Sequence, residues 1–487
     1  MRTMLLSMVV VLVPVGVGAA VIGSNTPIVP LTEARIRAEA PKGEQRAWLE
    51  YLQRSAAQMG ADKAALAAER AGMSEVPGLP KQGFSGRAMR LHAGDAFYKS
   101  DEARKTGDII VSFQTPAGGW SKNLMMDEPR LKGQSYATGN LAPTPERPGD
   151  FDEPKDPSWH YVGTLDNDAT NTELRFLAEL SAALPGHEGD GYRAAALRGY
   201  EYLLRAQYPN GGWPQVWPLE GGYHDAITFN DNAVIESAET LAKVANGVKV
   251  TTQPSEEEVQ FARLRTTPGG QKMDDPATST EDYTFVPVEL RARAKKAAEK
   301  ATALVLRVQV KVLAASQPTS QKRDPSTGSG QAVGHPDRMV LTVWAQQYDP
   351  LTLQPCSARN YEMPALSSGE SADAMEYLMS LPKPSAEVVR AVDAAAAWFE
   401  QSKITGYVFV GGRGTPGGRH LEKKDDAGPL WARYYSLTTG KPIFGDRDKS
   451  IHDDVMEISL ERRNGYAWYS GGEEKALEEY GAWRRRQ

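Results

Sequence analysis

A short motif that occurs twice constrains the fold more than any other feature of this chain. The segments at 114–120 and 207–213 share Gln, Pro, two consecutive Gly and Trp, and each follows an apolar run with helical spacing. A third, degraded copy runs from 306 to 309 and resumes at 341–344. Glycine commonly ends a helix in a tight turn, and repeated helical units bury their apolar faces against one another. The repeat therefore predicts a toroid of antiparallel helix hairpins.

The tryptophans of the two clear copies, Trp120 and Trp213, allow two interpretations. Each can pack its own turn against the neighbouring hairpin, which is a purely structural role. The turns of such a toroid also line its central cleft, where the flat face of a sugar can stack on an indole ring. We keep Trp213 as a candidate substrate-binding residue.

The rest of the chain also has helical periodicity. Apolar residues recur at helical spacing in 192–206 and 290–308, and Ser367 to Glu370 forms a capping box before a further helix. Strand-like alternation is clearest at 407–410. These patterns predict a mainly α fold.

Changes in composition divide the chain into segments. We expect a signal peptide at 1–20, a helical N-terminal appendage with its linker at 21–83, and the main domain at 84–487. Two stretches rich in Pro, Ser, Thr and Gly, at about 247–280 and 314–338, have the composition of inserted surface loops.

The amino terminus has the pattern of an export signal. Arg2 precedes an uncharged apolar run from Met4 to Val17, and the small residues 18–20 follow it. A retained membrane anchor is the alternative, but Pro14 and the short apolar core favour cleavage. We expect a secreted or periplasmic protein that has no membrane contact after cleavage.

Charge and cysteine content narrow the choice of partners and of stabilising features. The net charge of the 487-residue chain is −6, so nucleic-acid binding is not expected. Cys356 is the single cysteine, which rules out an intrachain disulfide. Stability must then come from a large core, and we expect the protein to act as a monomer.

Two stretches with several oxygen-bearing side chains precede predicted helices. Asp166, Asn167 and Asp168 stand before one apolar periodic run, and 230–232 (Asn-Asp-Asn) stand before another. Helix capping explains one Asx side chain at each place, and Thr170 to Glu173 is itself a capping box. Capping leaves the other oxygens unexplained, and a hard cation such as Ca²⁺ takes ligands of this type.

Basic residues alternate with aromatic residues in several turn-like segments towards the carboxyl terminus. Examples are Arg359 near Tyr361, Arg433 between Trp431 and Tyr434, and Arg447. Each arginine alone could be a surface ion-pair partner. Together, guanidinium groups that grip carboxylates and rings that stack on sugars describe a site for an acidic polysaccharide.

At this point the sequence resembles the family 10 polysaccharide lyases, which are pectate lyases with an (α/α)3-type toroid. The runs that carry the resemblance are Gly118–Asn123, Thr164–Thr170, Gly211–Gln215, Tyr223–Asp225 with Thr228–Asp231, Leu341–Trp344, Ala358–Glu362, Trp431–Tyr435, and Asp446–Arg447 with Glu461–Tyr466. They span roughly 84 to 472, so the resemblance covers most of the chain.

The resemblance implies Ca²⁺-dependent anti β-elimination of polygalacturonate, which gives 4,5-unsaturated oligogalacturonides. It implies that Asp166 is a calcium ligand, that Asp231 lies in the same cleft with Asn167 as a further candidate ligand, and that Arg359 is the base. Lys122, Arg433 and Arg447 would bind uronate carboxylates.

An arginine base is costly. Its neutral fraction near pH 9 is roughly 10⁻⁴ to 10⁻⁵, a cost on the order of 5–7 kcal/mol, so an alkaline activity optimum is expected.

Three other functions fit parts of the sequence. A toroidal glycoside hydrolase could use Asp166 and Asp231 as acid and base if their carboxyl groups lie about 6.5–9.5 Å apart. A terpene-cyclase-like protein would share the Gly-Gly-Trp turns, but the arginine-rich segments argue against an apolar cavity. A secreted pectin-binding module would keep its affinity without turnover.

Overall fold

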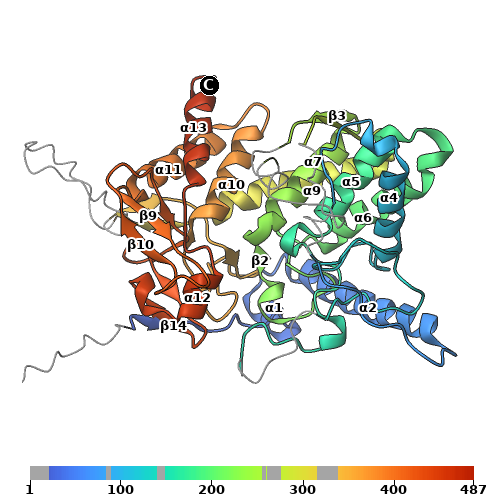
Figure 1. Cartoon of the computed structure of the whole chain (residues 1–487), viewed down its shortest axis with the longest axis horizontal. Coiled ribbons are helices and arrows are strands. Elements are labelled where there is room, and N and C mark those ends of the chain that lie inside the picture. The colour runs from blue at the N-terminus through green and yellow to red at the C-terminus, as the bar shows by residue number, and fades with distance from the viewer. Residues whose placement is uncertain (1–20, 84–88, 140–148, 255–258, 260–275, 315–337) are drawn as a thin grey trace, which may run out of the picture.

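The computed structural model describes residues 21–83, 89–139, 149–254, 259, 276–314 and 338–487. Helices dominate these residues, which confirms the predicted mainly α fold (Figure 1). The α-helices are α1 (Glu33–Glu39), α2 (Gln45–Arg70), α4 (Asp101–Phe113), α5 (Asn171–Ala183), α6 (Asp190–Ala206), α7 (Ala233–Asn246), α9 (Val288–Val308), α10 (Ser368–Ser380), α11 (Ala386–Ser402), α12 (Leu460–Gly465) and α13 (Glu473–Arg484).

The strands are short, and each pairs either with a strand close to it in the sequence or with one from a distant part of the chain. They are β1 (Gly23–Ser24), β2 (Ile227–Thr228), β3 (Lys249–Thr252), β4 (Ser279–Asp282), β5 (Lys311–Leu313), β6 (Met339–Leu341), β7 (Gln347–Tyr348), β8 (Leu366–Ser367), β9 (Tyr407–Val410), β10 (His420–Lys423), β11 (Trp431–Ala432), β12 (Tyr434–Tyr435), β13 (Phe444–Gly445), β14 (Ser450–His452) and β15 (Tyr469–Ser470). The longest ladders are the antiparallel pairs β3–β4 and β9–β10.

The tryptophan of each repeat makes the same contact with the helix before it. The indole N–H of Trp120 donates to the carbonyl of Ile110 in α4 at 2.7 Å, and that of Trp213 donates to Leu203 in α6 at 2.8 Å. The third copy does the same, since Trp344 donates to the α9 carbonyl of Val305 at 2.7 Å. A fourth copy, which sequence analysis missed, is Trp431, whose N–H donates to Phe399 in α11 at 2.9 Å.

The glutamine of the repeat ties each turn to the next helix of the ring. The side-chain amide of Gln114 donates to the carbonyl of Gly118 in its own turn and to Ala195 in α6. Gln207 bonds in the same way to its own turn and to α9, and Gln309 bonds to the carbonyl of Thr342 and to α11. The repeat therefore encodes both the end of one helix and its attachment to the following one.

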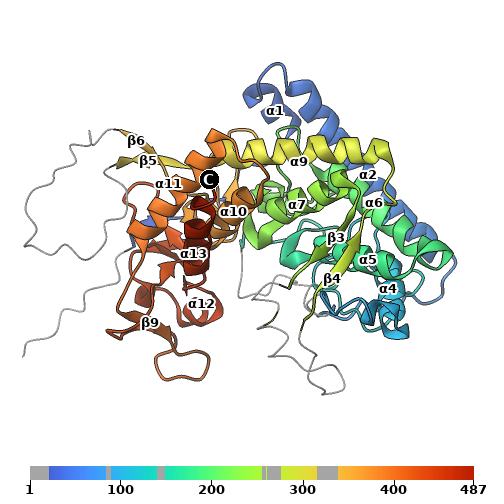
Figure 2. The same cartoon turned by 90° about the horizontal axis from the view of Figure 1, so that it is seen from above.

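The helices are arranged as successive hairpins around one core. Helices α4 to α6 lie at one end of the molecule, and α10 to α13 with strands β9 to β14 lie towards the other (Figure 1). Helix α7 lies nearer the middle, with α9 running along it (Figure 2). One cluster of buried apolar side chains includes residues from all these hairpins, and its fully buried tryptophans include Trp120, Trp213, Trp344 and Trp431.

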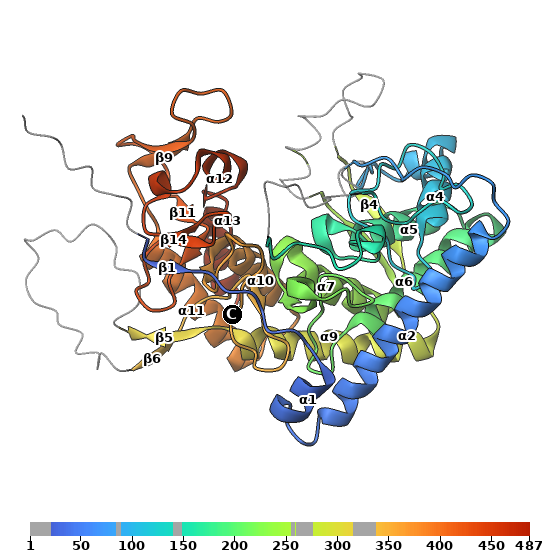
Figure 3. The ribbon, with the colours of Figure 1, turned by 90° about the horizontal axis from the view of Figure 1, so that it is seen from below.

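The N-terminal segment packs onto this core. Helix α2 crosses the outside of α6 and α9 when the molecule is seen from below (Figure 3). Trp48 and Tyr51 of α2 belong to the main cluster, and the Tyr51 hydroxyl donates to the carbonyl of Ala206 at 2.8 Å. Strand β1 pairs with β14, so the chain just after residue 20 is joined to the carboxyl-terminal part. The predicted signal peptide at 1–20 lies outside the described residues.

The two predicted inserted loops begin and end in paired strands. Strands β3 and β4 bracket the first, and β5 and β6 bracket the second. The centres of both, at 255–258, 260–275 and 315–337, lie outside the described residues. Of the helices that the structure describes, none is both long enough and apolar enough to cross a membrane.

Candidate functional site

Asp166 and Asp231 occupy equivalent places before two inner helices. Asp166 begins a single 3₁₀ turn (Asp166–Asp168) before α5, and Asp231 lies in the corresponding turn (Asn230–Asn232) before α7. The two turns contact each other. Each contains a residue in the left-handed region, Asn167 with φ 52° and Asp231 with φ 49°. Such backbone strain concentrates at functional sites, because the surrounding structure must hold it.

The two carboxyl groups share a buried and charged environment. Asp166 is fully buried, and its Oδ2 accepts from Lys122 Nζ at 2.7 Å. Burial alone would raise the pKa of Asp166, but the positive charges of Lys122 and Arg359 outweigh it and lower that pKa. Burial and the Asp166 carboxylate raise the pKa of Asp231 well above its usual range. Two acids and one ammonium group are therefore packed together; we call this set the carboxylate side.

The carboxylate side fits a hard divalent cation. Among the described residues, Asp166 Oδ1 and Asn232 Oδ1 are buried and have no hydrogen-bond partner. The Asn167 amide donates to Asn123 Oδ1 at 2.8 Å, and the Asn230 amide donates to Asp231 Oδ2 at 2.7 Å. Buried oxygens without donors, beside a carboxyl group that resists ionisation, are what a Ca²⁺ ion would satisfy.

Arg359 lies in a loop whose conformation its neighbours fix. Its backbone N–H donates to Glu362 Oε2 at 2.9 Å, and its Nη1 is 3.3 Å from the Tyr361 hydroxyl. The Asn25 amide donates to the carbonyls of three residues of the loop: Arg359, Asn360 and Glu362. Burial would lower the pKa of Arg359, but Tyr361 and Glu362 outweigh it and raise that pKa.

An acidic residue that sequence analysis missed, Asp152, joins the two parts of the site. Arg359 Nε lies 3.8 Å from Asp152 Oδ2. Asp152 Oδ1 accepts from the hydroxyls of Tyr161 at 3.2 Å and Tyr223 at 2.9 Å. Lys122 Nζ lies 4.1 Å from the centroid of the Tyr161 ring. Contacts therefore run from Asp166 through Lys122, Tyr161 and Asp152 to Arg359; we call Arg359, Glu362 and Asp152 the arginine side.

The other two predicted carboxylate-binding arginines border this site. Arg433 Nη2 donates to Glu370 Oε1 at 2.7 Å and to Asn230 Oδ1 at 3.3 Å, which places it next to Asp231. Arg447 lies over the Tyr361 ring and pairs with Glu461 at 3.1 Å. The side chains of Arg433 and Arg447 are 22% and 26% exposed, so both keep surface that an anionic ligand can reach.

The expectation that Trp213 stacks on a sugar is wrong. Trp213 and Trp120 have no exposed surface, because their rings fill the space between successive hairpins and their indole N–H groups bond to the preceding helix. The structural interpretation of both residues is correct.

Several polar residues near the site, His160, Glu220 and His224 among them, were not singled out from the sequence. The two histidines belong to a His-Tyr pair at 160–161 and a Tyr-His pair at 223–224. Each pair stands a few residues before one of the two Asp-rich turns. That mirrored spacing is the signal that could have identified them.

Comparison with known proteins identifies the family of this chain. The family model described as pectic acid lyase matches residues 114–267 and 336–477. A family 10 polysaccharide lyase from Cellvibrio cellulosa is 27% identical and has a TM-score of 0.55, covering 82% of this chain and 98% of its own. A mutant of family 10 polysaccharide lyase from the same organism, in complex with trigalacturonic acid, is 26% identical over 82% of this chain and 99% of its own, also with a TM-score of 0.55. A comparison with curated proteins gave no match.

These matches confirm the predicted family and the toroidal fold, and they set aside the hydrolase, terpene-cyclase and non-enzymatic hypotheses. The chain belongs to the pectic acid lyase family and is a polysaccharide lyase of family 10, with an (α/α)3-type toroid.

Proposed function

We propose that the protein is a pectate lyase that cleaves polygalacturonate by Ca²⁺-dependent β-elimination and releases 4,5-unsaturated oligogalacturonides. The observation that carries the proposal is the buried, unpartnered Asp166 Oδ1 next to Asp231, in one continuous site with Arg359. The trigalacturonic acid bound by the Cellvibrio cellulosa lyase supports a uronate substrate.

Each charged residue has a role in this reaction. The proton on C5 of a uronate is α to a carboxylate, so its removal builds negative charge on that carboxylate. Bound Ca²⁺ would supply Lewis-acid stabilisation of that charge, with Asp166, Asp231 and Asn167 as its ligands. Lys122, Arg433 and Arg447 hold uronate carboxylates, and Arg359 takes the C5 proton. The electron pair left on C5 forms the C4–C5 double bond, the C4–O4 bond breaks, and the leaving oxygen takes a proton from water.

The environment of Arg359 sets the expected pH dependence. Since Tyr361 and Glu362 raise its pKa, the neutral guanidine is rare at neutral pH. The rate should therefore rise with pH through the alkaline range.

The test is incubation of the purified protein with polygalacturonate, with the ultraviolet absorbance of unsaturated uronides as the readout. Absorbance should grow with added Ca²⁺, vanish in a chelator that binds Ca²⁺, and return when Ca²⁺ is restored. Release of reducing ends without absorbance would contradict elimination, and full activity in the chelator would contradict the calcium role.

The remaining proposals concern where the protein works. We infer that residues 1–20 direct export to the periplasm or the medium, and that the mature enzyme acts as a monomer on its polysaccharide. Mass spectrometry of the mature amino terminus and light scattering of the purified enzyme test these two statements.

A further inference from the structure

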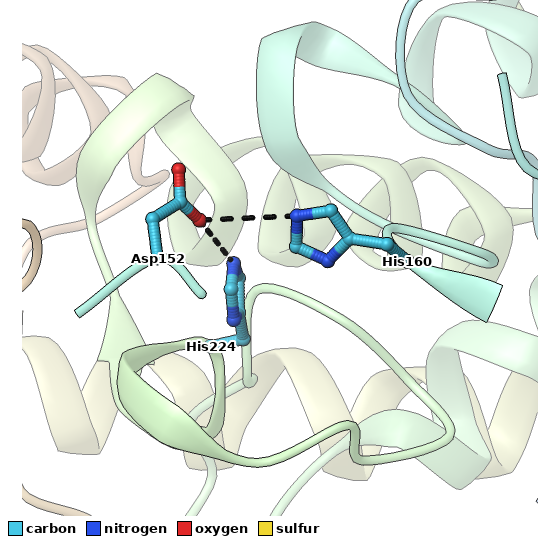
Figure 4. Close-up of side chains that lie close together, drawn as sticks. All are labelled: Asp152, His160 and His224. Atoms are coloured by element: carbon cyan, nitrogen blue, oxygen red, sulfur yellow. Dashed lines mark ion pairs between the residues drawn. The ribbon is translucent and has the colours of Figure 1, made fainter. Parts of the chain in front are cut away.

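Two histidines and an aspartate converge at a buried point behind Arg359. The Nε2 atoms of His224 and His160 lie 3.3 Å and 3.9 Å from the same oxygen, Asp152 Oδ1 (Figure 4). The two rings are nearly perpendicular, at 85°, with centroids 5.4 Å apart. All three ligand atoms lie within 4.8 Å of one another.

A single carboxylate holds both rings from the other side. Glu220 Oε1 lies 3.0 Å from His160 Nδ1 and 3.0 Å from His224 Nδ1, and Glu220 Oε2 accepts from the Tyr161 backbone. Because a carboxylate only accepts, both Nδ1 atoms carry hydrogen. When the rings are neutral, each Nε2 therefore carries no hydrogen, and its lone pair points towards Asp152.

Asp152 Oδ1 is the one group that the two Nε2 atoms face. The two histidines are 4% and 3% exposed, and apart from the contacts with Asp152 at 3.3 Å and 3.9 Å, their buried Nε2 atoms have no hydrogen-bond partner among the residues that the structure describes. Buried polar atoms are rarely left in this state, so the unused pair indicates a missing partner.

We propose that His160, His224 and Asp152 form a binding site for a transition-metal ion of the Zn²⁺ type, separate from the calcium site. Imidazole nitrogen is a poor ligand for Ca²⁺ and a good one for zinc, cobalt, nickel and copper. Histidines that bind such metals characteristically donate their other N–H to a carboxylate or a backbone carbonyl. Glu220 is that acceptor for His160, and the Gly221 carbonyl, at 3.3 Å, is that acceptor for His224.

The geometry and the charges suit this ion. Ligands of a tetrahedral zinc ion lie about 3.3 Å apart when the bonds are roughly 2.0–2.1 Å long, so 3.3 Å and 3.9 Å need only a small contraction. One divalent ion would also neutralise the two buried carboxylates, Asp152 and Glu220. A cavity of about 200 Å³ borders Glu220 and His224.

A proton and two hydroxyls compete with the metal. Burial would lower the pKa of His224, but Glu220 and Asp152 outweigh it and raise that pKa, so a proton on Nε2 is the rival occupant. The Tyr223 hydroxyl donates to Asp152 Oδ1 at 2.9 Å. The single hydroxyl hydrogen of Tyr161 has two acceptors within reach, Asp152 Oδ1 at 3.2 Å and the Tyr223 oxygen at 2.7 Å. When Tyr161 donates to Tyr223, one lone pair of Oδ1 is left for a metal.

The experiment is metal binding by the whole enzyme with Ca²⁺ in excess, so that the calcium site is filled. Wild type is freed of metal by chelator, then titrated with Zn²⁺ by calorimetry and with Co²⁺ by visible absorption. We expect one equivalent of Zn²⁺, and a Co²⁺ spectrum of tetrahedral intensity that Zn²⁺ displaces. Wild type that takes up neither ion under these conditions overturns the proposal, and no variant is needed for that outcome.

Variants identify the ligands. His160→Ala and His224→Ala should each abolish the Co²⁺ spectrum, and Glu220→Gln should weaken Zn²⁺ binding by roughly 10–100-fold. His187→Ala, which removes a fully exposed histidine, is the matched control and should bind normally. Asp166→Asn should lose the calcium response and keep Zn²⁺, which separates this site from the proposed calcium site. Zn²⁺ binding that survives in both histidine variants, or disappears in Asp166→Asn, also overturns the assignment.

Discussion

The two sides of the site are built in different ways. Asp166 and Asp231 stand at the amino ends of inner helices, each in a short turn with left-handed backbone, so the helix hairpins position them directly. Arg359 stands in an irregular loop that Glu362 of the same loop helps to fix, and its place also depends on Asp152 and the amide of Asn25, which are far away in the sequence. The carboxylate side is thus part of the repeat, and the arginine side is assembled by long-range contacts.

The difference has a functional reading. Ligands for a metal must keep fixed distances, and a rigid helix end holds them with little freedom. A base must approach C5 of the substrate, and the position of that carbon depends on how the polysaccharide binds. A loop can adjust to that position. Mutations on the two sides should therefore separate metal binding from chemistry.

The largest effect is expected from Arg359→Lys. A lysine keeps a positive charge but cannot reproduce the contacts of the guanidinium with Tyr361, Glu362 and Asp152. We expect kcat to fall by about 10²–10⁴-fold, the usual contribution of a general base, while Ca²⁺ affinity stays within a factor of a few. Steady-state kinetics and calorimetry measure the two. Wild-type kcat/KM in this variant would remove Arg359 from the role of base.

The second effect belongs to the carboxylate side. Asp166→Asn removes the charge that faces Lys122 and supplies the proposed metal ligand. We expect kcat/KM to drop by roughly 10²–10³-fold. Ca²⁺ affinity should fall with it, unlike in Arg359→Lys.

The matched control is Asp156→Asn, which removes a half-exposed aspartate paired with Lys63. It should leave both quantities near wild type. Unchanged Ca²⁺ affinity in Asp166→Asn would place the calcium ion elsewhere.

The sequence predicts the carboxylate side better than the arginine side, and the reason is physical. Gln114, Gln207 and Gln309 each bond to their own turn and to the next helix, so a local motif carries tertiary information. The fourth turn keeps Trp431 but has no Gly-Gly pair directly before it, and a motif search passes over it.

Burial is the second property that the sequence does not predict. The sequence around Trp213 is the same whether its ring faces a cleft or a helix, and only the packing of the folded chain decides between the two. Asp152 was missed because the contact that gives it meaning, with Arg359, joins two loops that have no shared pattern.

A third test concerns a buried acid in the helix that follows Asp166. Glu173 in the capping box of α5 accepts from the Thr170 N–H, and burial raises its pKa to about 8. A raised carboxyl pKa means that the folded state holds a proton that the unfolded state releases above about 4.5. Its stabilising contribution is full below that pH and is lost as pH rises through about 8.

Glu173→Gln keeps the cap and removes this titration. The free energy of unfolding of the variant, measured with denaturant, should gain on wild type by roughly 2–3 kcal/mol between pH 6 and pH 9. A difference that is the same at both pH values would show that Glu173 is ionised in the folded protein. The result matters for an enzyme expected to work in alkali.

The smallest effect is expected from Asn25→Ala, and it tests the arginine side alone. The Asn25 amide is buried and donates to Arg359, Asn360 and Glu362 carbonyls at 3.1, 3.0 and 3.2 Å, so its loss leaves these acceptors without their donor. An unsatisfied buried group costs about 1–3 kcal/mol. If half of that free energy appears as misplacement of the Arg359 loop, kcat falls by about 3–10-fold.

Ca²⁺ affinity should not change, because no contact of Asn25 reaches Asp166 or Asp231 in the described chain. Asn210→Ala is the control, since its amide likewise donates to a backbone carbonyl, that of Pro350, and not to the Arg359 loop. A loss of Ca²⁺ affinity in Asn25→Ala, matching its loss of kcat, would mean that the two sides form one rigid unit rather than a fixed metal site beside an adjustable base.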